Sequence, residues 1–172
     1  MTRGATSAAT LAVLVALCAV GAVLGIRALT AELPDRPLVT EPPVCEPRPV
    51  ARGDVVRPGD VVVSVFNAGD RAGQASQTMR RLIERGFTPA DSGNAPEGTD
   101  IDFVQVWVAG PKNPAARLVA AQFGPDTVVK GNQEELGVGV MVLVGNRLGE
   151  LAPRVEQVRA GRDSEICSPP AQ

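Results

Sequence analysis

Histidine and tyrosine are absent from this chain of 172 residues, and aromatic side chains make up only 3% of it. The lack of histidine removes the most common general base and metal ligand of neutral pH. The formal net charge is -2, so the chain has no excess of basic side chains with which to bind nucleic acid. These absences exclude histidine-dependent catalysis and argue against nucleic acid as a partner.

A nucleophile and a base do not occur together anywhere in the sequence. The serines have no histidine to activate them, and neither Lys112 nor Lys130 adjoins a serine. Asp100 and Asp102 form an Asp-x-Asp pair, but two carboxylates alone rarely hold a divalent cation. We therefore expect a protein that is not an enzyme and that has no metal and no cofactor.

A long apolar run lies near the N-terminus. From Leu11 to Ile26 the only polar side chain is Cys18, and the run approaches the ~20 residues needed to cross a bilayer. A cleaved signal peptide is the alternative, but its apolar core is only ~7–15 residues long. We therefore expect a short cytoplasmic tail at residues 1–7 and a single transmembrane anchor at residues 8–29.

Two glycines in this run suggest a second role for it. Gly21 and Gly25 form a Gly-x-x-x-Gly pattern, and small residues at that spacing let two membrane helices approach closely. A homodimer formed through this face is a hypothesis, because a segment rich in alanine and glycine produces such a match easily.

Only three cysteines occur in the chain, and two of them flank its central part. Cys45 and Cys167 could form a disulfide that joins the two ends of a folded domain, with Cys18 left free. Such a bond persists only in an oxidising compartment, so it would place the bulk of the chain outside the cytoplasm. The distribution of lysine and arginine around the apolar run does not establish this orientation. Two unrelated free thiols are the alternative.

Residues 30–58 contain seven prolines, which fix φ and lack an amide donor. We expect this segment to be an extracytoplasmic spacer, neither helix nor inner strand. A compact domain is expected at residues 59–150. Residues 151–172 should form an irregular tail with one short helix, tied back by the disulfide.

The compact domain alternates strand and helix patterns. Strands are expected at "VVVSVF", "FTPAD", "DFVQVWVAG", "TVV" and "VGVMVLVG", and helices at "QASQTMRRLIERGF" and "NPAARLVAAQF". The order is strand, helix, strand, strand, helix, strand, strand. It predicts an α/β fold, an α+β sandwich of two layers in which an open mixed sheet carries both helices on one face.

The stretch "SVFNAGDRAG" lies between the first strand and the first helix. It is not a phosphate-binding P-loop, because Gly73 is followed by Gln74 and no lysine follows. One hypothesis is a turn formed by Asn67 and Gly69, with Gly69 at a φ that only glycine adopts easily. The other is an anion site, in which free helix amides act together with Arg71. We favour the turn.

These residues also resemble a known family. The run from Val61 to Leu148 resembles the LytR C-terminal domain family, with Asn67 at the end of the first strand and Gly73 opening the helix. Further matching positions are Gly86, Phe87, Asn94, Ala95 and Gly145. Gln74 departs from the family's usual leucine, and Phe66 also replaces a leucine. The resemblance implies a stand-alone, membrane-anchored envelope protein of the actinobacterial type, in a family whose domain has no established chemistry.

The most economical function is therefore a non-enzymatic, single-pass protein of the cell envelope that binds a cell-wall glycan or a lipid-linked precursor. A scaffold for other envelope or wall-ligase proteins is the alternative, and an uncharacterised envelope enzyme is the second. Besides the turn, Phe103 and Trp107 are candidate ligand contacts, because they share a strand face. That face is either a second core or an exposed patch, and burial is favoured because large aromatic side chains are usually mostly buried.

Overall fold

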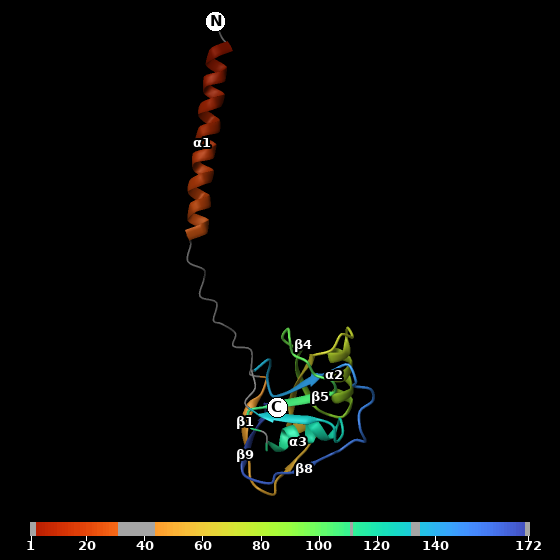
Figure 1. Ribbon diagram of the computed structural model, residues 1–172. Helices are drawn as coiled ribbons and strands as arrows, with labels where there is room; N and C mark the ends of the chain where they lie inside the picture. Colours follow the sequence, from red (N-terminus) through yellow and green to blue (C-terminus); the bar gives the residue numbers. More distant parts are fainter. Residues whose placement is uncertain (1–2, 31–43, 111, 132–134, 171–172) are drawn as a thin grey trace. The chain divides into compact units, whose positions relative to one another are not determined.

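The computed structural model describes residues 3–30, 44–110, 112–131 and 135–170 (Figure 1). The chain divides into two compact units, Met1–Glu41 and Pro42–Gln172. Residues 31–43 of the predicted spacer lie outside the described residues.

The first unit contains one helix, α1, which runs from Arg3 to Thr30. Side chains are described for residues 11–27, and the large apolar ones among them are exposed, Leu11 at 64% for example. Within the described part of the chain, no helix is both long enough and apolar enough to cross a membrane. The helix forms where we predicted it, and its role as a membrane anchor stays a prediction.

The second unit is built on a five-stranded mixed sheet with the strand order β4-β3-β7-β5-β6. Its strands are β3 (Val62–Asn67), β4 (Thr88–Asn94), β5 (Val104–Val108), β6 (Val128–Gly131) and β7 (Val140–Val144). β3 runs parallel to β4 and β7, β5 runs parallel to β6, and β5 is antiparallel to β7. The predicted α/β class is therefore confirmed.

Two strand–helix–strand units lie on either side of β7. We call β3, α2 (Gln74–Glu84) and β4 the α2 half, and β5, α3 (Pro114–Ala121) and β6 the α3 half. The two halves run in opposite directions because β3 is parallel to β7 and β5 is antiparallel to it. In each half the helix connects two neighbouring parallel strands, as a helical crossover does.

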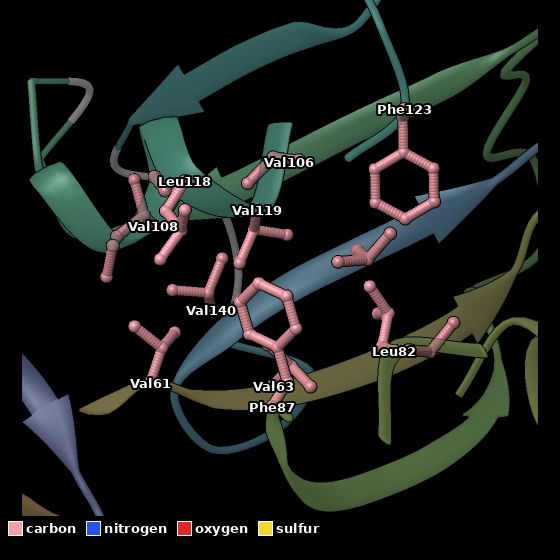
Figure 2. Close-up of a cluster of buried hydrophobic side chains, with 14 of the residues drawn as sticks. Val61, Val63, Leu82, Phe87, Val106, Val108, Leu118, Val119, Phe123 and Val140 are labelled. Atoms are coloured by element: carbon pink, nitrogen blue, oxygen red, sulfur yellow. The ribbon is translucent and has the colours of Figure 1, made fainter. Parts of the chain in front are cut away.

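The main core lies between both helices and one face of the sheet (Figure 2). Val63 from β3, Val106 from β5 and Val140 from β7 point toward Leu82 of α2 and Leu118 of α3. Along each of these strands, the side chains that face the helices alternate with side chains that face the other way, as expected when helices cover one face of a sheet. Both helices therefore pack on one face, as predicted.

A smaller cluster fills part of the opposite face of the sheet. It contains Phe66, Ile101, Trp107, Met141 and Leu143. Loop residues cover it, because Ile101 precedes β5 and the partly buried Leu136 precedes β7. The opposite face is thus a second core, and Trp107 belongs to it.

Two short antiparallel ribbons complete the domain. They extend it beyond the predicted residues 59–150 into the segments that were predicted to be a spacer and an irregular tail. β1 (Glu46–Val50) pairs with β9 (Ser164–Ser168), and β2 (Val55–Val56) pairs with β8 (Val158–Arg159). The spacer prediction was therefore wrong from Glu46 onward, and the predicted order omitted these four strands. The tail forms strands in place of the expected short helix.

Prolines do not prevent β1, because it pairs on one side only. Pro47 and Pro49 are two residues apart, so their nitrogens share one edge of the strand. A strand with a single neighbour needs amide donors on only one edge, which is where proline is tolerated in sheets. The ribbons, together with the 3-10 turn η1 (Pro58–Asp60), lie against α3, whereas α2 packs mainly on β3, β4 and β7.

The residues that end the two helices bind each other. Arg85 is the C-cap of α2 and Gln122 is the C-cap of α3, and Arg85 Nη1 donates to Gln122 Oε1 over 2.8 Å. Arg85 Nη2 also donates to the carbonyl of Ala152, and the buried Gln122 Nε2 donates to that of Val155. Burial lowers the pKa of Arg85, and the positive charge of Arg154 lowers it further. This contact joins both halves to the returning tail.

Candidate functional site

The stretch between β3 and α2 forms a closed network of local hydrogen bonds. Asn67 Oδ1 accepts from the amide of Gly69 at 3.2 Å, and Asn67 Nδ2 donates to the carbonyl of Arg71 at 3.0 Å. The amide of Asp70 donates to Asn146 Oδ1, and Asn146 Nδ2 donates to Asp70 Oδ2. Asn67 therefore shapes the turn, and Asn146, which follows β7, anchors it.

We predicted that Gly69 adopts a φ that only glycine adopts easily, and this prediction was wrong. Positive φ angles are found at Gly73 (76°) and at other glycines, and Gly69 is not among them. A Cβ at Gly69 would instead overlap the side chain of Asn146 and would lie 3.0 Å from its backbone nitrogen. The turn therefore needs glycine at position 69 for close approach, and at position 73 for backbone conformation.

Arg71 lies across the turn and does more than add charge. Its Nη2 donates to the carbonyls of Asn146 at 2.6 Å and Leu148 at 2.8 Å. Both acceptors are neutral, and no ion pair to Arg71 occurs among the described residues. The side chain thus fixes the segment after β7 and keeps its positive charge uncompensated.

The start of α2 has no side-chain cap. Gly73, in the left-handed conformation, is the N-cap residue and offers no oxygen to the first amides. Gln74, the first helical residue, is 6% exposed, and its Nε2 donates to the carbonyl of Gly145 at 2.7 Å. Its Oε1 has no hydrogen-bond partner among the described residues. A buried acceptor without a donor is unusual in a folded protein.

A cavity of about 350 Å³ lies beside this helix start. We call it the α2 groove. Its lining comes from the first turns of α2, the residues before them and the segment after β7: Arg71, Ala72, Gln74, Gln77, Thr78, Arg81, Leu148 and Gly149. Arg81 donates to the carbonyl of Gly149 across the groove at 2.8 Å. The groove therefore joins Arg71, predicted from the sequence, to residues that were not predicted.

Phe103 and Trp107 do not join this site. Trp107 is 9% exposed in the second core, and its Nε1 donates to Gln105 Oε1. Phe103 packs against the main core instead, so the two aromatic rings do not form one surface. Trp107 is therefore not an open platform on which a sugar could stack, and Phe103 is only partly exposed.

The predicted disulfide is present at the other end of the sheet. Cys45 and Cys167 are bonded, with their Cα atoms 5.4 Å apart and a sequence separation of 122, and Cys18 is free. Cavities of about 430, 180 and 460 Å³ lie nearby and all touch Ala109. The first of these is lined by Lys112 and Arg162 but also by Glu165, so this end of the domain carries both signs of charge.

The sequence held one signal for the residues that were missed. Gln74 is a polar residue where the resemblance expects leucine, and a polar side chain at an apolar position indicates a special environment. Arg81 and Asn146 gave no such signal, because their contacts connect segments more than sixty residues apart. Within the described part of the chain, no group of three His, Cys, Asp or Glu side chains is placed to hold a metal ion.

With the fold and the groove established, comparison with known proteins identifies the class. Residues 60–147 match the LytR C-terminal domain family, described as "LytR cell envelope-related transcriptional attenuator". The match covers more than half of the chain, and the chain belongs to this family. The assignment gives it an envelope-related role.

Among solved structures, the chain is similar to the soluble domain of a conserved hypothetical secreted protein from Mycobacterium marinum. The two are 26% identical, the alignment covers 61% of this chain and 70% of that chain, and the TM-score is 0.48. No curated protein gives a significant match.

Proposed function

We propose that this chain is a non-enzymatic, membrane-anchored protein that works outside the cytoplasm and binds a lipid-linked cell-wall precursor or a cell-wall glycan. Membership of an envelope-related family supports the setting. The Cys45–Cys167 disulfide supports an oxidising compartment, because such bonds are rare in the cytoplasm. The observation that carries the ligand is the α2 groove, with two arginines that form no ion pair among the described residues.

The proposed anchor is α1. It is a helix of 28 residues, and its described apolar side chains face outward around it, Leu14, Val15 and Val20 among them. Exposed apolar side chains on all sides of a helix are costly in water and favourable in lipid. An alkaline phosphatase fused after residue 172 should therefore be active in cells, and a cytoplasmic reporter there should be silent. The reverse pattern would contradict the proposed orientation.

Between the two ligands, the side chains favour the precursor. Trp107 is buried and Phe103 packs on the main core, so neither can stack on a neutral sugar in the way aromatic residues do at many binding sites. Arginine side chains suit a phosphate group, which they bind through charge-assisted hydrogen bonds. A lipid-linked precursor carries such a group next to its sugar.

A co-sedimentation experiment tests this function. The full chain in detergent should bind liposomes that contain a lipid-linked wall precursor more strongly than liposomes of the same charge made with phosphatidylglycerol. Purified wall polysaccharide should bind more weakly. Equal binding to all three, or binding to none, would contradict the proposed function.

A scaffold for envelope or wall-ligase proteins is the second function, and the charged cavities at the disulfide end favour it. Lys112, Arg162 and Glu165 there match the mixed polar character of protein interfaces better than they match one anion. Adding detergent-extracted membrane proteins to a pull-down with the full chain distinguishes the two. Specific capture that persists without any precursor would favour the scaffold.

We also propose that α1 can pair with a second copy through Gly21 and Gly25. Among the described residues of its own unit, a Cβ at either glycine would meet nothing within 4 Å, so the helix itself leaves room for a partner helix at this face. Replacing both by isoleucine should reduce cross-linking in membranes if the pattern is used. Unchanged cross-linking would exclude this face.

A further inference from the structure

We propose that the α2 groove is a specific site for a phosphorylated ligand that also carries a hydroxyl group, such as a sugar phosphate. This inference rests on the proposed function and deepens it, because it names the residues and the chemical class that they recognise. Four features of the groove carry it: its charge, the way its arginines are held, the helix start and the buried Gln74.

The charge of the groove has one sign only. Arg71 and Arg81 are the charged side chains among its lining residues, and no carboxylate lies among them. Neither arginine forms an ion pair within the described part of the chain. At the disulfide end, by contrast, Glu165 lines the same cavity as Lys112 and Arg162. The α2 groove is therefore the better match for an anion.

Both guanidinium groups are held in place by neutral backbone carbonyls. Arg71 is fixed by the carbonyls of Asn146 and Leu148, and Arg81 by the carbonyl of Gly149. Each contact uses one terminal nitrogen, and a guanidinium has five N–H donors, so other donors remain on each group. An arginine that is already oriented loses less conformational freedom when it binds a phosphate.

The helix start adds further donors. The first amides of an α-helix have no partner within the helix, and no side chain caps those of α2. The positive end of the helix dipole lies there as well. Ala72 and Gln74, which flank Gly73, both line the groove, so the uncapped end of α2 lies at its edge. Amides and arginines together therefore favour a group with several acceptor oxygens.

Gln74 points to more than a phosphate. It lines the groove, it is almost completely buried, and its Nε2 is already bonded to the carbonyl of Gly145. The remaining Oε1 is an acceptor without a donor, and the phosphate of a monoester, which is mostly dianionic at neutral pH, offers almost only acceptor oxygens. A ligand hydroxyl would satisfy it. A volume of about 350 Å³ suits a small organic ligand better than a bare ion.

Calorimetric titration of the full chain in detergent micelles tests the site with three probes: N-acetylglucosamine 1-phosphate, inorganic phosphate and N-acetylglucosamine. We expect the sugar phosphate to bind most tightly and the neutral sugar not to bind. The Arg81→Gln variant should raise the Kd for the sugar phosphate about tenfold, because a charge-assisted hydrogen bond between the guanidinium and the phosphate is lost. The matched control Arg80→Gln removes the same charge from the next residue, which is exposed and outside the groove, and should change the Kd less than about twofold.

A second variant tests the acceptor. Gln74→Met keeps the length of the side chain but removes both the acceptor oxygen and the Nε2 donor to the carbonyl of Gly145, so it should weaken binding of the sugar phosphate. If either variant melts early, amide NMR shifts of the unaltered full chain give the answer. Addition of the sugar phosphate should move the signals of residues 74–76 and leave those of residues 115–117 in place.

The outcomes separate this inference from the proposed function. Equal affinity of the Arg81→Gln and Arg80→Gln variants, or shifts confined to residues outside the groove, would overturn the site. If Arg81→Gln still binds precursor liposomes normally, the groove is not the site, although the proposed function stands. If the sugar phosphate binds in the groove but the chain binds no envelope material, the site stands and the proposed function fails.

Discussion

The two halves of the domain follow the same plan but begin their helices differently. In the α3 half, Asn113 caps the helix by accepting from the amide of Ala115, and Pro114 occupies the first helical position. In the α2 half, a left-handed glycine precedes the helix and no side chain caps it. The ribbons lie against α3, whereas the start of α2 borders an open groove. The α3 half therefore provides a side-chain acceptor for the first amides of its helix, whereas the α2 half leaves the first amides of its helix without one.

Among the changes that should affect the two halves differently, removal of the disulfide should have the largest effect on stability. The Cys45→Ser, Cys167→Ser double variant should lose about 2–5 kcal/mol of unfolding free energy, because the unfolded chain is no longer constrained. Hydrogen exchange should rise most in β1, β9 and α3, since the ribbons lie against that half. Denaturant unfolding and mass-spectrometric exchange measure the two effects. An equal rise in α2 and α3 would show that the ribbons do not support one half preferentially, and Cys18→Ser serves as control.

Loss of the contact between the two helix ends should have the second-largest effect on stability. Gln122 is fully buried, and Gln122→Ala removes its hydrogen bonds to Arg85, Leu118 and Val155. We expect a loss of about 2–4 kcal/mol in thermal unfolding, because several buried polar groups lose their partners. The exposed Gln77→Ala should change stability by less than about 0.5 kcal/mol. Similar effects of both changes would contradict a joint role for Gln122.

The close approach in the α2 half should give a smaller effect. Gly69→Ala places a Cβ against Asn146 and should cost about 1–3 kcal/mol, as overpacking does. The Gly69→Ala, Asn146→Ala double variant should lose less than the sum of the two single changes, because the collision partner is gone. Urea unfolding of the four proteins measures this coupling. Strict additivity would show that Asn146 is not the obstacle.

The helix starts themselves should give the smallest effects. Asn113→Ala removes the cap of α3 and should cost about 1 kcal/mol. Gly73→Asn should cost less than about 0.5 kcal/mol, since asparagine tolerates the left-handed conformation better than other residues with a side chain. Thermal unfolding compares the two. A larger loss for Gly73→Asn would mean that the start of α2 depends on glycine for more than its φ.

The sequence predicted those parts of the fold that depend on local pattern. The valine-rich strands and the two helices of the domain are each read from neighbouring residues. The ribbons were missed because β1 contains Pro47 and Pro49, and its pairing with β9 depends on a partner more than one hundred residues away. The pairing of Cys45 with Cys167 was predictable because the number of cysteines left few choices.

The candidate site was only half predictable for the same reason. Asn67 and Arg71 lie in one conspicuous turn, whereas the groove also needs Leu148 and Gly149 from the segment after β7. The two carbonyl contacts of Arg71 appear only when β3 and β7 lie side by side. Local sequence therefore located the turn but not the cavity beside it.

The pairing of the first strand of the domain with its last affects how the protein can be made. A ribosome releases Cys45 long before Cys167, with 122 residues of separation between them. Until β9 has been synthesised, β1 has no partner, and Cys45 remains a free thiol that can react with other proteins. Completion of this domain must therefore follow synthesis of β9, and truncation before β9 would leave β1 unpaired.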